Sequence, residues 1–160
     1  MKKLTKALLA AAAVLSFAGC ANSGASTAAL SDPTAMEQEF TANGFEVRDV
    51  KTPAAGETVF KAVGANGGAN VRVDQYESAE QAKDAYDTLK ASLTQSMYYM
   101  LNEKTFADGG IATFNNSINY VDAIAAYDEK TNTVIEASEI SQDNLDTILT
   151  ALEAYGIVLQ

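Results

Sequence analysis

The sequence of 160 residues predicts an α+β domain, a two-layer sandwich in which helices cover one face of a mainly antiparallel sheet of about six strands. Three observations predict this class. Short apolar or alternating segments are separated by short polar turns, and such connections favour antiparallel pairing. Two further segments, after Ser78 and after Ser141, repeat apolar residues at helical spacing. Because amphipathic helices need a sheet face to cover, helices and sheet should form two packed layers.

The first half of the domain is expected to hold a short helix and three strands. Asp32 followed by Pro33 is typical of a helix start, and Gly44 of a helix end, so the helix should run to about Asn43. The strands are expected, in order, at 45–50, 57–63 and 70–76. The glycine-rich segment between the last two should be a hairpin turn, because the dinucleotide-binding fingerprint needs a helix after it rather than a strand.

A long helix should close this first half. Ser78 and Gln81 form a capping-box pattern, and helical spacing continues to about Leu101. A loop is expected from Asn102 to Gly110. Strands should follow at 111–114, 118–127 and 133–138, and Ser141 should cap a last helix.

An internal repeat is also predicted. The segments 59–93 and 121–155 share the order strand, turn, strand and serine-capped helix, which is consistent with duplication of a βββα unit.

One predicted strand suggests a binding face. The residues from Tyr120 to Tyr127 are apolar on both faces of the strand, apart from Asp122. The strand is therefore either central and partly covered by the first helix, or it lies at a ligand or dimer surface. On the second reading, Tyr76, Tyr120 and Ile124 are the candidate binding residues.

The first twenty residues predict export. Lys2, Lys3 and Lys6 precede an apolar run from Ala7 to Ala18, with no acidic residue before Cys20. At about 1.5 Å per residue this run is much shorter than the ~30 Å core of a bilayer. It therefore has the length of a signal-peptide core rather than of a membrane span.

The end of this leader allows two cleavage sites. Small residues at Ser16 and Ala18 would suit an ordinary cut after Ala18. The run Phe17-Ala18-Gly19-Cys20 instead resembles the lipobox of bacterial lipoprotein precursors, although Phe17 stands where leucine is usual. The resemblance implies cleavage between Gly19 and Cys20, with lipid (palmitate) on Cys20. The only cysteine of the chain is Cys20, which excludes an internal disulfide and favours this reading.

Composition restricts the chemistry. Residues 1–20 hold three of the 11 basic residues and none of the 21 acidic ones, so the remaining chain carries a net charge of −13. So acidic a chain should bind neither nucleic acid nor anionic lipid headgroups through its surface. The chain has no histidine, which removes the commonest general base and metal ligand, and no metal or cofactor is expected.

The sequence thus predicts a signal peptide at 1–19, a lipidated Cys20 with a flexible tether at 20–31, and one domain at 32–160. The expected protein is anchored at the outer face of the cell membrane or in the outer membrane, and its domain binds or scaffolds an unknown protein or small molecule without catalysis. Two alternatives are a structural envelope protein that forms a homodimer, and a hydrolase. The hydrolase would use paired carboxylates from the set Asp74, Glu77, Glu80 and Asp122.

Overall fold

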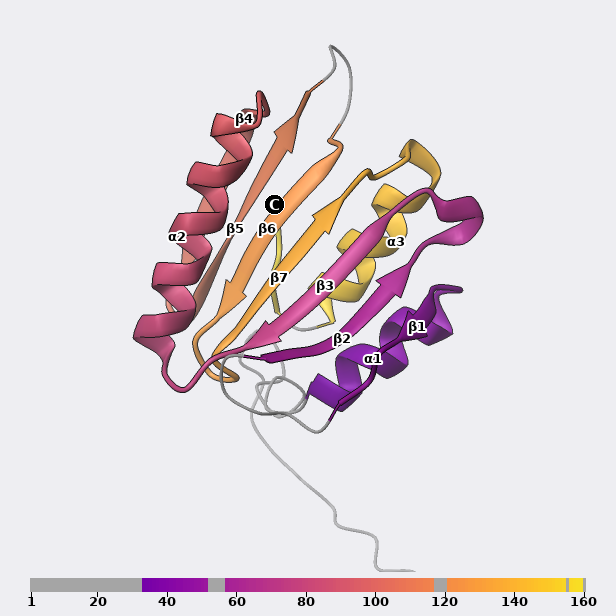
Figure 1. Ribbon diagram of the computed structural model, residues 1–160, viewed down its shortest axis with the longest axis horizontal. Coiled ribbons are helices and arrows are strands. Elements are labelled where there is room, and N and C mark those ends of the chain that lie inside the picture. Colours follow the sequence, from indigo (N-terminus) through magenta and orange to yellow (C-terminus); the bar gives the residue numbers. More distant parts are fainter. Residues whose placement is uncertain (1–32, 52–56, 117–120, 155, 160) are drawn as a thin grey trace, which may run out of the picture.

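The computed structural model describes residues 33–51, 57–116, 121–154 and 156–159. Three helices and seven strands follow one another along the chain (Figure 1). The first half contains α1 (Pro33–Ala42), β1 (Glu46–Arg48), β2 (Glu57–Val63), the single-turn 3₁₀ helix η1 (Ala65–Gly67), β3 (Asn70–Gln75) and α2 (Ala79–Gln95). The second half contains β4 (Tyr99–Phe106), β5 (Gly109–Asn115), β6 (Ala123–Asp128), β7 (Thr133–Ser138) and α3 (Gln142–Glu153).

All seven strands form one open sheet in the order β1-β2-β3-β7-β6-β5-β4, and every neighbouring pair is antiparallel. The predicted α+β class with a mainly antiparallel sheet is therefore confirmed. The strands predicted at 57–63, 70–76 and 133–138 agree with β2, β3 and β7 to within one residue. The glycine-rich segment joins β2 to β3 as the expected hairpin.

The helices lie on both faces of the sheet, so the expectation of helices on one face was wrong. Consecutive residues of a strand point to opposite faces, and in β7 Val134 packs in a cluster with α2 whereas Ile135 packs with α1 and α3. Figure 1 shows α2 in front of the sheet and α3 behind it. The central strands are apolar on both faces, and each face therefore needs its own cover.

The end of α2 differs from the prediction. The helix stops at Gln95, and β4 occupies residues expected to be helix and loop. Met97 has a left-handed backbone (φ 69°), the N–H of Tyr98 donates to the carbonyl of Leu93 at 3.1 Å, and the N–H of Met97 donates to that of Thr94 at 3.3 Å. These bonds form a Schellman motif, which usually has glycine at the left-handed position. Because methionine stands there, the sequence shows no helix end.

The duplication is not confirmed. The units β1-β2-β3 and β5-β6-β7 do lie on either side of the β3–β7 pair. A two-fold axis that exchanges these two units runs perpendicular to the sheet, so it would place equivalent helices on the same face. The helices α2 and α3 instead lie on opposite faces. The repeat is therefore one of element order.

Several predictions concern residues outside the described part of the chain. These are the leader, Gly19, Cys20, the tether, Asp32 and Tyr120. Among the described residues, no helix has both the length and the apolar character needed to cross a membrane.

Candidate binding face

The sheet face that carries α2 is only half covered. In the contact cluster on this side, α2 packs over β5, β6 and β7, and Figure 1 shows β2 and β3 on the far side of β7 with no helix drawn in front of them. The outward side chains of β1, β2, β3 and the adjoining edge of β7 form what we call the open face. Its members are Glu46, Arg48, Lys61, Asn70, Arg72, Asp74, Glu136 and Ser138.

Three cations lie side by side on the open face. Arg48 is opposite Lys61 in the β1–β2 register, and Lys61 is opposite Arg72 in the β2–β3 register. Opposite residues of antiparallel strands share a face with their Cβ atoms ~5 Å apart, and like charges there are destabilising. We call these residues the basic row. They include both arginines of a chain whose residues after Cys20 carry 21 acidic and eight basic side chains.

Carboxylates offset this repulsion. Both carboxylate oxygens of Glu46 accept from Arg48, at 2.8 and 2.7 Å. Arg72 contacts Asp74 through Nε at 2.9 Å and Glu136 through Nη2 at 3.1 Å. All three cations are about half exposed, so water screens these pairs.

The first of these pairs shifts both ionisations. The hydrogen bond and the charge of Arg48 lower the pKa of Glu46, and Glu46 in turn raises the pKa of Arg48. Both side chains therefore stay charged over a wide pH range. This pair consequently stays ionised at neutral pH.

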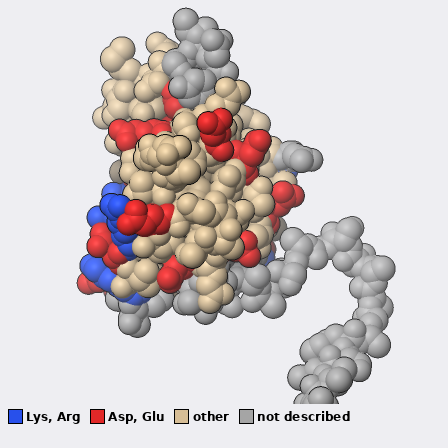
Figure 2. Space-filling view, turned by 90° about the vertical axis from the view of Figure 1, so that its right-hand side faces the viewer, with Lys and Arg blue, Asp and Glu red and all other residues tan. Residues whose placement is uncertain are grey.

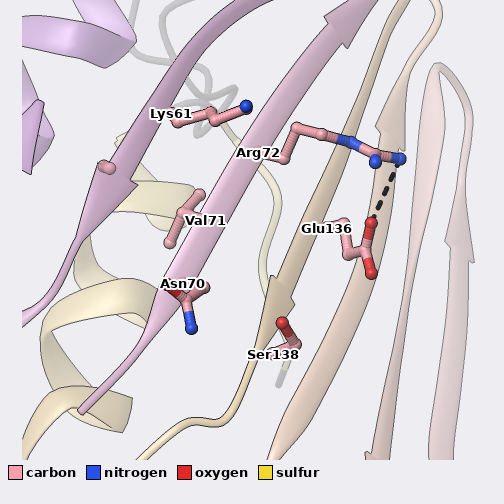
Figure 3. Close-up of a pocket in the computed structure, with 7 residues that line it drawn as sticks. Lys61, Asn70, Val71, Arg72, Glu136 and Ser138 are labelled. Atoms are coloured by element: carbon pink, nitrogen blue, oxygen red, sulfur yellow. Dashed lines mark ion pairs between the residues drawn. The ribbon is translucent and has the colours of Figure 1, made fainter. Parts of the chain in front are cut away.

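A pocket of about 230 Å³ lies in the open face (Figure 3). It spans three strands, with Lys61 from β2, Arg72 and Asn70 from β3, and Glu136 and Ser138 from β7. In Figure 3 the side chains of Lys61 and Arg72 extend in the same direction, and Arg72 reaches across to Glu136. The pocket therefore offers donors and one carboxylate acceptor close together.

Figure 2 views the molecule from the side of β1 and α1. Most of the Lys and Arg atoms in this view gather along one margin, interleaved with Asp and Glu, whereas the charged atoms in the rest of the view are mainly those of Asp and Glu. The basic side chains on this side of the molecule are thus concentrated rather than scattered.

Of the predicted binding residues, the two that the structure describes, Tyr76 and Ile124, do not come together. Tyr76 is half-buried at the border between the open face and α2, where burial, followed by the nearby Asp74 carboxylate, raises its pKa. Ile124 is fully buried on the opposite face, against α1 and α3. The prediction of an exposed binding face that includes Ile124 is therefore wrong. The other reading of this strand holds in part, because β6 is covered on both faces, by α2 on one and by the cluster that contains α1 and α3 on the other.

Two of the candidate catalytic carboxylates, Asp74 and Asp122, are also separated. Asp74 is level with Val134 and hence with Tyr127, five residues along β6 from Asp122. At about 3.3 Å per residue the two aspartates lie about 16 Å apart along the sheet, beyond the 5–9.5 Å that glycoside hydrolysis uses. Asp74 is moreover bound by Arg72 and by the hydroxyl of Thr58, at 2.7 Å.

A second, larger pocket of about 370 Å³ is lined by Tyr98, Asn116, Asp122, Glu139, Ile140 and Ser141. Its polar groups are already engaged: the buried Asp122 accepts from the backbone N–H of Asn116 at 3.0 Å, Glu139 accepts from Asn70 at 2.5 Å, and the Ser141 hydroxyl accepts from Asn144 at 2.8 Å. In the part of the chain that the structure describes, no group of three or more Asp, Glu, Cys or His side chains is arranged to hold a metal ion.

The largest exposed apolar side chains lie elsewhere, around the start of β4. Met97, Tyr99, Met100 and Leu101 are each more than half exposed. Since β4 is the last strand of the sheet, its outer edge has no strand partner within the described residues.

Comparison with protein-family models, with curated proteins and with solved structures found no match to this chain.

Sequence reasoning missed the basic row. Its members Arg48, Lys61 and Arg72 belong to three strands whose register is not visible in the sequence. One signal was available: Lys61 and Arg72 both alternate with core-facing residues, in two strands joined by a hairpin, and could be expected on the same face.

Proposed function

We propose that this protein is a lipid-anchored, non-catalytic binding protein of the cell envelope, and that the open face contacts its ligand. The observation that carries the binding role is the uncovered half of the sheet, where charged side chains and a pocket lie together although α2 buries the other half. Exposed residues gathered on a rigid sheet are typical of ligand recognition. The separation of Asp74 from Asp122 supports binding over a hydrolysis that would pair these two carboxylates.

The anchor is supported by the leader and by the charge of the chain. A basic, then apolar segment ends in the chain's only cysteine, in a run that resembles a lipobox. A net charge of −13 after Cys20 would repel the protein from anionic lipid, so attachment through the protein surface is unfavourable. Two or more acyl chains hold a protein stably on a bilayer, whereas one holds it marginally.

The anchor is tested by metabolic labelling with a palmitate analogue in a bacterial host. We expect the wild-type protein to incorporate label and to sediment with membranes, and Cys20→Ala to do neither. Equal labelling of the two proteins would overturn the lipoprotein assignment. Ser16→Ala serves as the matched control and should label like the wild type.

A second candidate is a structural role through a homodimer, and the exposed apolar side chains beside the unpaired edge of β4 favour it. In this candidate the dimer would form through the edge of β4, and not through the sheet face that the sequence suggested. Sedimentation equilibrium that gives the mass of a single chain at every protein concentration would exclude the homodimer.

A further inference from the structure

We propose that the pocket on the open face binds a carboxylate group of the ligand, with Lys61 and Arg72 as the cationic partners and Ser138 as a hydroxyl donor. The inference rests on the proposed function, because it takes the open face as the ligand-contacting surface. It adds the chemical class of the group that is recognised there.

The charge of the pocket carries the first step. Two cations and one carboxylate line it, in a molecule whose remaining surface is strongly acidic. Among the described residues, the only ion pair of Lys61 is with Asp49 at 3.5 Å, and both side chains are more than half exposed. A pair of this kind holds its lysine weakly. The Lys61 ammonium is therefore available to an incoming anion.

Arg72 supplies the second cation with donors to spare. A guanidinium carries five N–H donors in a planar fork, and the contacts of Arg72 with Asp74 and Glu136 involve only Nε and Nη2. The flat fork matches a carboxylate, which can accept two parallel hydrogen bonds. Glu136 and Asp74 meanwhile hold the guanidinium in place at the pocket.

The neutral end of the pocket offers a further donor. Ser138 lies opposite Asn70 in the β3–β7 register, and its hydroxyl makes no hydrogen bond within the described residues, whereas the Asn70 amide donates to Glu139. The volume of about 230 Å³ lies below the range typical of complete small-molecule sites. The pocket therefore suits one group of a ligand that extends over the open face.

Phosphate fits less well than carboxylate. Glu136 lies in the pocket wall and Asp74 next to it, so any bound anion experiences their repulsion. A phosphate monoester carries nearly two negative charges at neutral pH and a carboxylate only one. The same two cations therefore leave a larger net repulsion for phosphate.

The test is an NMR titration of the ¹⁵N-labelled full-length protein in a non-ionic detergent. Sodium acetate replaces sodium chloride at constant ionic strength and neutral pH. We expect saturable shifts of amides in β2, β3 and β7 around the pocket, with unchanged amides in α2. Sodium phosphate in a parallel titration should bind more weakly. No saturable shift, or tighter binding of phosphate than of acetate, would overturn the inference.

Variants make the test specific. Lys61→Gln should weaken acetate binding at least about tenfold, the effect expected from losing one charge-assisted contact. Lys61→Arg keeps the charge and should retain most of the binding. Lys83→Gln, which removes an equally exposed lysine from α2, is the matched control and should bind like the wild type. Equal binding by Lys61→Gln and the wild type, with both folded by circular dichroism, would contradict the proposal.

The two proposals fail separately. A protein that labels with palmitate but does not bind acetate would remove the carboxylate inference and leave the anchor. A protein that binds acetate at Lys61 without labelling would do the reverse.

Discussion

Met97 sets the point at which α2 ends and the chain turns into β4. Its left-handed backbone allows the two Schellman hydrogen bonds, and its side chain is 76% exposed, so it contributes little packing in return. A non-glycine residue in this conformation costs about 1–2 kcal/mol. The turn is therefore made by backbone geometry alone, at a residue that is poorly suited to it.

Met97→Gly should stabilise the protein by roughly 0.5–1 kcal/mol, because relief of the left-handed strain exceeds the added freedom of glycine in the unfolded chain. Urea denaturation followed by circular dichroism measures the change. Met97→Val is the contrasting variant and should destabilise, since a β-branched residue is least tolerant of positive φ. A glycine variant less stable than the wild type would show that the turn is not strained.

At the scale of elements, the β2–β3 hairpin and the start of α3 are packed directly against each other. The backbone N–H of Ser141 donates to the carbonyl of Gly68 at 2.6 Å, and the amide of the buried Asn144 donates to the carbonyl of Ala65 at 3.3 Å. A Cβ on Gly68 would lie 2.5 Å from the Ser141 hydroxyl oxygen. Glycine is needed at this position for close approach, not for a phosphate.

Gly68→Ala should destabilise the protein by about 1–3 kcal/mol, the usual cost of overpacking, although its φ of −83° suits alanine. Gly67→Ala is the matched control, since a Cβ there meets nothing within 4 Å and only its φ of +70° opposes substitution. We expect a loss of about 1 kcal/mol for Gly67→Ala. Chemical denaturation ranks the two, and a smaller loss for Gly68→Ala would contradict the packing argument.

The elements also show what sequence could predict. Strands β2, β3 and β7 were found because their residues alternate between an apolar face packed in the core and a more polar face. The start of α2 agrees with the prediction because the Ser78 hydroxyl accepts a hydrogen bond from the N–H of Gln81 at 3.2 Å. The strand β4 was missed because it is an exposed edge without a buried stripe and follows a helix end without glycine. The candidate site was missed because cross-strand register decides which residues are neighbours.

For the whole molecule, the titration of buried tyrosines limits stability at high pH. Tyr86 is 3% exposed, its ring lies 4.6 Å from that of Tyr127, and Lys90 lies 4.4 Å from its ring centroid. Burial, followed by the Glu103 carboxylate that accepts from its hydroxyl, raises the pKa of Tyr86 above its ordinary value of 10.0. Burial also raises the pKa of Tyr127 and Tyr98. A raised pKa in the folded state contributes stability that is complete below the unfolded pKa and is lost as pH rises above it.

We therefore expect the free energy of unfolding to fall as pH rises above about 10, the ordinary pKa of tyrosine. Tyr86→Phe should lower the free energy of unfolding by about 0.5–1.5 kcal/mol at pH 7, because the hydrogen bond of the hydroxyl is lost. Above pH 10 the free energy of unfolding of this variant should fall less steeply than that of the wild type. Urea denaturation between pH 8 and pH 11 measures both quantities. The control is Tyr99→Phe, because Tyr99 is 69% exposed. This variant should show the same dependence of unfolding free energy on pH as the wild type. Parallel profiles for Tyr86→Phe and the wild type would refute this account.

The place of β7 in the sheet has a consequence for how the chain folds. The last strand to be synthesised lies between β3 and β6, so the two halves of the sheet are joined only when residue 138 is available. Pairing β3 with β7 closes a loop of roughly sixty residues, a contact that forms late and slowly. Until then β3 and β6 each lack a neighbour, and a nascent chain cannot complete its core. For a protein that we propose is exported, this delay leaves the native sheet incomplete for longer, and a chain without its completed core can be threaded across a membrane more readily than a folded one.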